Sequence, residues 1–365
     1  MEVNGQAYRS IWLAADGVGV EIIDQTCLPF RFQVVRLECL EDAMEAISRM
    51  LVRGAPLIGA TAAYGMCLGL RRDVGSQAVE EMACRLAGCR PTAVNLRWAV
   101  ERMVRCLLPL PEEQRLGAAY REAGRICAED VAANEAIGRH GLALINALWR
   151  AKPEGEPLHI LTHCNAGWLA TVDWGTALAP VYAAAAAGIP VHVWVDETRP
   201  RNQGASLTAW ELAAAGISHH LLVDNAGGHL MQRGLVDLCL VGSDRTTAGG
   251  DVCNKIGTYL KALAAWDNGV PFYAALPGST VDWAMDNGVA EIPIEERGME
   301  EVLRIQGEDE SGTVRTVTIA PAATPAVNPA FDVTPARLVT GLITERGICS
   351  ASRNGLTALY PEQGR

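Results

Sequence analysis

The stretch HILTHCNAG (159–167) joins an apolar run to a polar cluster, and it sets the pattern for the second half of the chain. Four further apolar runs of strand length follow it, and each gap between successive runs has room for a helix. Buried strands that alternate with helices are typical of βαβ units, which build a parallel, doubly wound α/β sheet. We therefore expect strands at 159–162, 191–195, 221–223, 238–241 and 272–276.

Polar residues follow directly after most of these runs. In parallel sheets, ligands bind beyond the carboxyl ends of the strands, so the candidate functional residues are expected at these places. The clusters are His163-Cys164-Asn165, Asp196-Glu197-Thr198-Arg199, Asp224-Asn225 and Ser243-Asp244-Arg245.

The first half of the chain has a different pattern of apolar and polar residues. Residues 8–38 are patterned like short strands and turns, 40–51 carry apolar residues at helical spacing, and 112–150 favour one or two long helices. The segment AKPEGEP (151–157) is rich in turn formers, so we place a domain boundary there, between 1–152 and 153–365. The polar stretch 306–318 is expected on the surface.

Composition limits the class of protein. The 365 residues include 31 Lys+Arg and 42 Asp+Glu, which gives a formal charge of −11, and 49% are hydrophobic, as in a folded two-domain protein. The acidic excess argues against coating of nucleic acid or an anionic membrane, but not against a small anionic substrate. The apolar runs are too short to span a bilayer and the N-terminus lacks a signal-peptide pattern, so we expect a cytoplasmic protein.

The eleven cysteines lack CxxC pairs and zinc-type spacing, so we expect no metal site and mostly buried, free thiols. Cys164 is the exception, because it stands at a strand end, beside polar groups and before a glycine turn, where a catalytic acid or base would lie. Nearby positive charge would lower the pKa of its thiol. His163 either orients Cys164 or is a structural residue.

Two arginines precede helices that open with proline, at Arg53-Gly54-Ala55-Pro56 and Arg90-Pro91-Thr92. Proline suits the first helical turn, whose free N–H groups and dipole favour an anion, and arginine adds a fixed positive fork. The pair predicts either a phosphate cradle or two solvated surface arginines.

Two further clusters follow the fourth run. Asp244 is either a general acid or a residue that caps the next loop or pairs with Arg245. The sequence GGDVCNK (249–255) places Asn254 and Lys255 at the start of a helix expected over 256–266, where they resemble an anion site. The order is not a Walker A motif, and no GxGxxG follows the first strand, so neither a nucleoside triphosphate nor a dinucleotide cofactor is supported.

Seven stretches together resemble the methylthioribose-1-phosphate isomerase family, from about residue 50 to 350 and in the same order. The wider family includes ribose-1,5-bisphosphate isomerase and the regulatory subunits of eukaryotic initiation factor 2B. The stretches are RGAPLIGATAAYG (53–65), RPTAVNLRWA (90–99), THCNAGWLAT (162–171), DETRPRNQGASLTAWEL (196–212), GSDRTTAGGDVCNKIGTY (242–259), IPIEER (292–297) and NPAFDVTP (328–335).

The resemblance implies a mainly helical N-terminal domain with a small β-sheet, a Rossmann-like C-terminal domain, a homodimer and no cofactor. It implies conversion of an aldose 1-phosphate to a ketose 1-phosphate in methionine salvage. Asp244 would then transfer protons to and from the sugar oxygens, and Cys164 would act at the carbon centre. The hydrogen would move from C2 to C1 either as a proton or as a hydride. The implied residues are the catalytic pair Cys164 and Asp244, and Arg53, Gly54, Ala55, Arg90, Gln203, Asn254 and Lys255 for substrate.

Three alternatives remain. A sister isomerase of 5-deoxyribose 1-phosphate or ribose 1,5-bisphosphate would share the cradle and differ at the sugar's 5-position, where Trp168, Leu169 and Trp174 offer an apolar pocket or plain packing. A non-catalytic regulatory subunit would not need Cys164 and Asp244 together with the cradle. A nicotinamide oxidoreductase is disfavoured by the missing glycine fingerprint.

Overall fold

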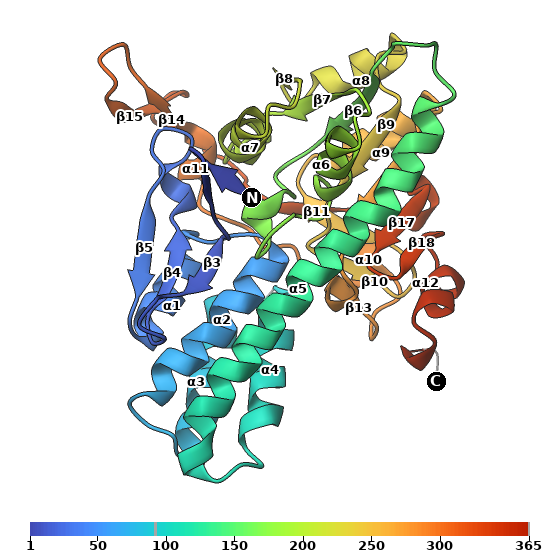
Figure 1. Ribbon diagram of the computed structural model, residues 1–365. Helices are drawn as coiled ribbons and strands as arrows, with labels where there is room; N and C mark the ends of the chain where they lie inside the picture. Colours follow the sequence, from blue (N-terminus) through green and yellow to red (C-terminus); the bar gives the residue numbers. More distant parts are fainter. Residues whose placement is uncertain (91–92, 364–365) are drawn as a thin grey trace.

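The computed structural model describes residues 1–90 and 93–363. Figure 1 shows a helical part, built from the first third of the chain, beside a part built around a parallel sheet. The helical part carries a small antiparallel sheet of β3 (Ile11–Leu13), β4 (Val20–Ile23) and β5 (Val34–Leu37). Its helices are α1 (Leu40–Ser48), α2 (Ala55–Leu70), α3 (Ser76–Cys89), α4 (Val94–Leu107) and the first half of α5 (Glu112–Trp149).

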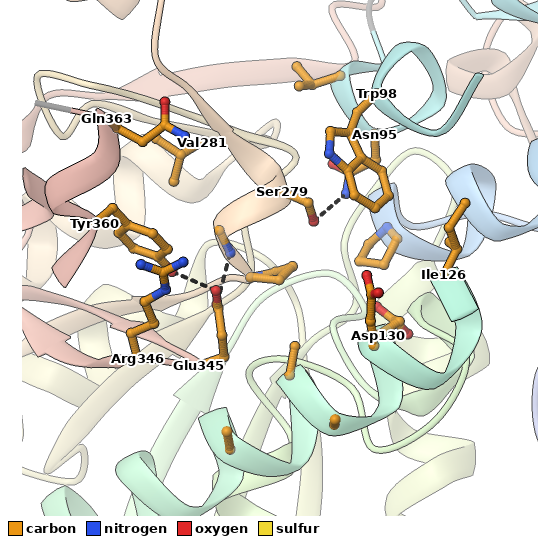
Figure 2. A pocket seen from close by; sticks show the side chains of 18 of the residues that line it. Asn95, Trp98, Ile126, Asp130, Ser279, Val281, Glu345, Arg346, Tyr360 and Gln363 are labelled. Carbon is orange, nitrogen blue, oxygen red and sulfur yellow. Dashed lines mark hydrogen bonds between the residues drawn. The ribbon is translucent and has the colours of Figure 1, made fainter. Parts of the chain in front are cut away.

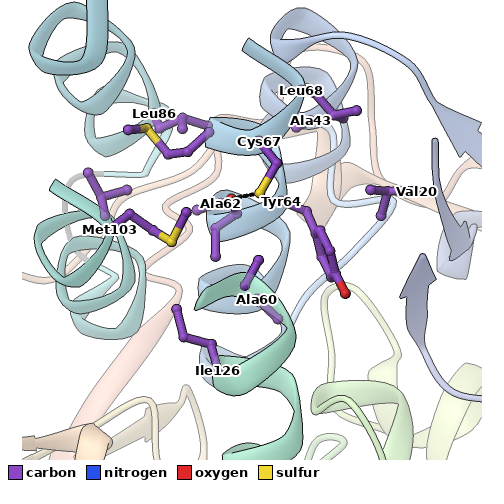
Figure 3. Packing of buried hydrophobic residues seen from close by; sticks show 14 of the residues in the cluster. Val20, Ala43, Ala60, Ala62, Tyr64, Cys67, Leu68, Leu86, Met103 and Ile126 are labelled. Carbon is purple, nitrogen blue, oxygen red and sulfur yellow. Dashed lines mark hydrogen bonds between the residues drawn. The ribbon is translucent and has the colours of Figure 1, made fainter. Parts of the chain in front are cut away.

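Helix α2 lies at the centre of the helical part. Every residue of α2 except Pro56 is buried, because α1, α3, α4 and α5 all pack against it. A helix that is apolar all round is stable only when it is enclosed in this way. Figure 3 shows side chains of this core, including Val20 from the small sheet and Ile126 from α5.

The second part contains a seven-stranded sheet in the order β18-β17-β12-β9-β6-β7-β8, parallel except for the edge strand β18. The chain runs from β6 outward through β7 to β8, returns to β9 beside β6, and then continues outward on the other side. The strands are β6 (Leu158–Thr162), β7 (Val191–Asp196), β8 (His219–Leu222), β9 (Leu238–Val241), β12 (Phe272–Ala275), β17 (Gly341–Thr344) and β18 (Gly347–Cys349).

Alternate residues of the central strands enter different cores. In β9, Leu238 and Leu240 pack with α6 (Ala179–Ala186) and α7 (Ala209–Ala214), whereas Cys239 and Val241 pack with α8 (Ala226–Gln232) and α9 (Thr258–Asp267). The sheet is therefore covered on both faces, as its continuous apolar strands predict.

A smaller mixed sheet and several short elements complete this part. The smaller sheet has the order β13-β10-β11-β16, formed by Val281–Asp282, Arg245–Thr247, Val252–Lys255 and Phe331–Thr334. An exposed hairpin, β14 (Arg304–Glu308) and β15 (Val314–Thr318), projects from the body in Figure 1. The other elements are β1 (Glu2–Val3), β2 (Gln6–Ala7), α10 (Gly288–Glu291), α11 (Glu300–Leu303), α12 (Arg353–Leu359) and several short helical turns.

The predicted α/β class and the mainly parallel sheet are confirmed, and the five expected strands are present with ends shifted by at most two residues. The segment 112–150 is one helix rather than two, and 306–318 lies on the surface, mostly within the hairpin. Pro91 and Thr92 lie outside the described residues, and α4 is described from Val94. The boundary near residue 152 stays a prediction.

None of the helices in the described ranges combines the length and the apolar character needed to cross a lipid bilayer.

Two glycines of α5 provide a paired test of how this helix joins the two parts. A Cβ at Gly141 would stand 2.3 Å from Cγ of Pro180 in α6, whereas a Cβ at Gly124 would meet nothing within 4 Å. We expect Gly141→Ala to lower the free energy of unfolding by about 1–3 kcal/mol. Gly124→Ala should raise it by about 0.5–1 kcal/mol. Urea unfolding measures both, and an unchanged midpoint for Gly141→Ala would contradict the packing described.

Candidate active site

Cys164 and Asp244 follow β6 and β9, the neighbouring strands between which the order of strand addition along the sheet reverses. β6 ends at Thr162 and β9 ends at Val241, and these strands are parallel neighbours. A change of direction between neighbouring parallel strands leaves a crevice beyond their carboxyl ends, the usual ligand site of such sheets. The structure brings the two residues to the lining of one cavity in this crevice.

Two small cavities adjoin at Ala55 and Asp244. The first contains most of the residues predicted from the sequence, and the second is lined mainly by apolar side chains. The first is lined by Arg53, Gly54, Ala55, Cys164, Asn165, Asp244 and Asn254, among others. The second is lined by Ala55, Ile58, Arg90, Ala93, Asp244, Arg245, Cys253, Ile292, Pro293 and Phe331.

The backbone of Cys164 is held in a left-handed conformation, with φ of 66°. Its N–H donates to Oγ1 of Thr198 at 2.8 Å, and its carbonyl accepts from Oγ1 of Thr208 at 2.7 Å. These bonds stabilise a conformation that non-glycine residues seldom adopt. The side chain of Cys164 is thereby fixed at the cavity wall.

Burial raises the pKa of the Cys164 thiol, although Arg53 and Lys255 act in the opposite direction. The expectation of a lowered pKa, based on nearby positive charge, is therefore wrong. Desolvation of a thiolate outweighs the attraction of two cations here, because the site is enclosed. Cys164 is a neutral thiol at neutral pH and a strong base once deprotonated.

Arg53 connects the helical part to the sheet. Its guanidinium donates from Nη2 to the backbone carbonyl of Asn165 at 2.7 Å and from Nη1 to the Asn165 side-chain oxygen. Gly54, with φ of 93°, caps α2, and a Cβ there would stand 2.3 Å from the carbonyl oxygen of Ala170. The predicted arrangement of arginine, glycine and helix start is present at this position.

Glu211 supports Asn165, and it is not among the site residues predicted from the sequence. Its buried carboxylate accepts from Asn165 Nδ2, from the N–H groups of Trp168 and Leu169, and from the Tyr182 hydroxyl, at 2.6–3.1 Å. Burial raises the pKa of Glu211 despite these bonds. The only sequence signal was an acidic residue in the otherwise apolar segment TAWEL (208–212).

Asn254 and Lys255 lie on a strand, not at a helix start. Val252–Lys255 forms β11, paired with β10 and β16, and α9 begins only at Thr258. The expectation of a helix-start site for these two residues is therefore wrong, because antiparallel pairing with Asp332 and Phe331 of β16 keeps the chain extended through them. Asn254 lines the first cavity.

Lys255 is a buried cation near the cavities. Its Nζ donates to the carbonyl of Ala330 at 2.8 Å and lies 4.2 Å from the ring centre of Phe331. Burial lowers the pKa of Lys255, while Cys164 and Asp244 oppose this shift and Arg90 and Arg53 add to it. An anion bound in the cavity would favour the protonated form of Lys255 and so raise its pKa again.

Arg90 and Gln203, like Lys255, are not among the residues that line the first cavity. Arg90 lines the second cavity and pairs with Glu295 at 3.1 Å. Gln203 is buried just before the turn η3 (Gly204–Thr208), and among the described residues its Oε1 has no hydrogen-bond partner. Gln203 does not contribute to the wall of either cavity as described above.

The aromatic residues considered for the sugar's 5-position lie elsewhere. Trp168 and Leu169 pack in the core of the sheet part. Neither these residues nor Trp174 is among those that line the two cavities. A separate hollow, shown in Figure 2, is lined by Trp98, Asp130 and Tyr360, and it contains none of the predicted site residues.

The cysteines are less buried than expected. All eleven are free, but only five are buried, including Cys164, and Cys84 is exposed.

One group of side chains in the described ranges has a spacing that could hold a metal ion: His163, Asp196 and Asp224. The ammonium of Lys261 stands 3.2 Å from Oδ2 of Asp196 and already supplies a positive charge there. These residues therefore form a buried ionic cluster rather than a vacant cation site.

The chain is similar to proteins of known family. The model of the initiation factor 2 subunit family matches residues 51–351. Methylthioribose-1-phosphate isomerases of Rhodospirillum rubrum and Paramagnetospirillum magneticum are 61% and 62% identical, over all of this chain and 94% and 100% of theirs.

Two solved structures agree with this. The 5-methylthioribose 1-phosphate isomerase of Pyrococcus horikoshii is 38% identical, with a TM-score of 0.82 over 98% of this chain and 97% of its own. A structure from A. fulgidus, described as the delta subunit of translation initiation factor eIF-2B, is also 38% identical, with a TM-score of 0.79 over 97% and 100%. The chain belongs to the initiation factor 2 subunit family and, within it, to the methylthioribose-1-phosphate isomerases.

Proposed function

We propose that this chain converts 5-methylthioribose 1-phosphate to 5-methylthioribulose 1-phosphate in methionine salvage, at the two cavities beside Cys164 and Asp244. The observation that carries the site assignment is the placement of a buried thiol and a carboxylate along one cavity, at neighbouring strand ends. Family membership supports the reaction.

The first cavity suits the sugar's phosphate. Within the described part of the chain, neither Arg53 nor Lys255 has a carboxylate within ion-pair distance, so their positive charge is available to an anion. Gly54 and Ala55 bring the start of α2 to the same wall, where free N–H groups and the helix dipole favour negative charge. Asn254 adds an amide donor to the wall of this cavity, whereas Gln203 and Arg90, which the resemblance also assigns to the substrate, lie outside it.

The reaction needs an acid that protonates the ring oxygen and a base that removes the proton from C2. In the proposed mechanism, the Asp244 carboxyl protonates the ring oxygen as its bond to C1 breaks. The base is the small fraction of Cys164 that is ionised before the substrate reacts: its thiolate then takes the C2 proton, which leaves an enol phosphate. The resulting thiol returns that proton to C1, and the Asp244 carboxylate takes the proton of the 2-hydroxyl as the ketone forms. Both residues end as they began.

The high thiol pKa suits this cycle, because a base of higher pKa removes a carbon-bound proton more readily. The enclosed site also keeps water from the enol phosphate.

The second cavity suits the methylthio group. Ile58, Ile292 and Phe331 give it apolar walls, and it adjoins the first cavity at Asp244. Its two arginines are engaged elsewhere, Arg90 with Glu295 and Arg245 with Asp282 at 3.5 Å. A second phosphate would have to separate these pairs. As parts of the same proposal, the enzyme works as a cytoplasmic homodimer and needs no metal or organic cofactor.

Replacement of the catalytic pair tests the assignment. Cys164→Ser and Asp244→Asn should each lower kcat by about 100-fold or more, because each removes a proton-transfer group and keeps the side-chain volume. Cys84→Ser, at an exposed thiol, is the matched control and should leave kcat unchanged. Steady-state kinetics with circular dichroism measures both. Near-normal turnover of either folded variant would refute the assignment.

A comparison of substrates tests the role of the second cavity. We expect the highest kcat/KM for methylthioribose 1-phosphate, a lower value for 5-deoxyribose 1-phosphate, which fills less of the apolar space, and the lowest for ribose 1,5-bisphosphate. Loss of one buried methylthio group corresponds to about 1–3 kcal/mol, or roughly 10- to 200-fold. A preference for the bisphosphate would assign the chain to the sister activity.

The thiol pKa predicts a pH dependence of alkylation. The folded pKa of Cys164 lies above its ordinary value, so the thiolate fraction is small at neutral pH and rises by about tenfold per pH unit up to pH ~9. The rate of inactivation by iodoacetamide, with modification of Cys164 followed by mass spectrometry, should rise accordingly. A rate that levels off below about pH 8 would show a lowered pKa and contradict the description of the site.

A further inference from the structure

A buried ionic cluster lies directly beside Cys164 but outside the two cavities. The ring of His163, the residue before Cys164, is fully buried, as is the carboxylate of Asp196 at the end of β7. His163 Nδ1 lies 2.8 Å from Asp196 Oδ2, and His163 Nε2 lies 2.8 Å from the carbonyl oxygen of Ile256. Lys261, from α9, lies 3.2 Å from the same Asp196 oxygen.

The partners of His163 determine where its protons lie. The Ile256 carbonyl can only accept, so Nε2 must donate. Asp196 Oδ2 lies 3.2 Å from the ammonium of Lys261, which can only donate, so this oxygen acts as an acceptor. Nδ1 must therefore donate as well. A ring that donates from both nitrogens is an imidazolium.

The charges that face His163 are consistent with this state. The charged groups near the ring are Asp196 on β7, Asp224 after β8 at 4.0 Å, Lys261 on α9 and Asp332 on β16. Three carboxylates and one ammonium leave a negative surplus, which a second cation at His163 reduces.

The contacts of His163 join two strands that carry site residues. His163 directly precedes Cys164, and its partner Ile256 directly follows Lys255. Gly257 makes this approach possible, because a Cβ there would stand 2.9 Å from Cε1 of the ring. One ring therefore connects the backbone beside the thiol to the backbone beside the buried ammonium.

We propose that His163, with protons on both ring nitrogens, is a positioning residue that fixes the separation between Cys164 and Lys255. The ring touches neither cavity and acts through its two backbone neighbours. The inference rests on the proposed function, since Cys164 is there the carbon base and Lys255 binds the phosphate. A shift of about 1 Å between such groups can cost about 100-fold in rate.

The proton assignment can be tested without turnover. In the wild-type protein labelled with ¹⁵N at histidine, we expect one ring to show two bonded N–H protons and two protonated-type nitrogen shifts at neutral pH. These signals should be absent from His163→Gln. A His163 ring with only one N–H would overturn the proposal. Because this readout needs no substrate, it remains decisive even if the proposed reaction is not observed.

The positioning role can be tested by kinetics. His163→Leu removes both donors and should lower kcat by about 100-fold, raise KM and weaken inhibition by inorganic phosphate, because Lys255 is displaced with Cys164. His163→Gln keeps one donor and should lie between His163→Leu and the wild type. His229→Gln, at an exposed position on α8, is the matched control and should be unchanged. Wild-type kcat and KM in folded His163→Leu would overturn the role.

Discussion

A forked contact from the Arg53 guanidinium to the side chain and main chain of Asn165 joins the helical part to the sheet where the site forms. Because Asn165 is itself held by the buried carboxylate of Glu211, the arginine is fixed without a direct ionic partner. Its charge therefore stays available to a phosphate. The other predicted elements of the site are arranged around this contact, with Cys164 on the same loop and Gly54 at the start of α2.

The electrostatics of the site differ from those of the whole chain. A net charge of −11 argues only against the binding of large polyanions, and Arg53 and Lys255 leave buried positive charge unneutralised beside the cavity. Burial acts on both signs here, since it raises the pKa of the Cys164 thiol and lowers the pKa of the Lys255 ammonium. A bound phosphate dianion would stabilise the charged ammonium of Lys255 and raise its pKa. Substrate binding and the protonation of the site are therefore coupled.

Much of the site was accessible from the sequence because its residues follow apolar strands. The strand ends at Thr162 and Val241 predicted where Cys164 and Asp244 would meet, and the proline in α2 predicted the position of Arg53. The strand that carries Lys255 was missed, since its pairing partner on β16 lies about 75 residues away in sequence. The roles of Glu211 and Asp196 were not predicted, because the partners of these carboxylates are far from them in the sequence. The assignment of Gln203 to substrate binding rests on the family resemblance alone.

In the proposed reaction, Cys164 and Asp244 act as one unit, each transferring protons to or from a different atom of the same substrate. The double variant Cys164→Ser/Asp244→Asn tests this most directly, because residues of one catalytic unit lose their effects together rather than independently. We expect kcat of the double variant to lie within a few-fold of that of the more damaged single variant. A loss equal to the product of the two single losses would show that the residues act separately and would contradict the proposed mechanism.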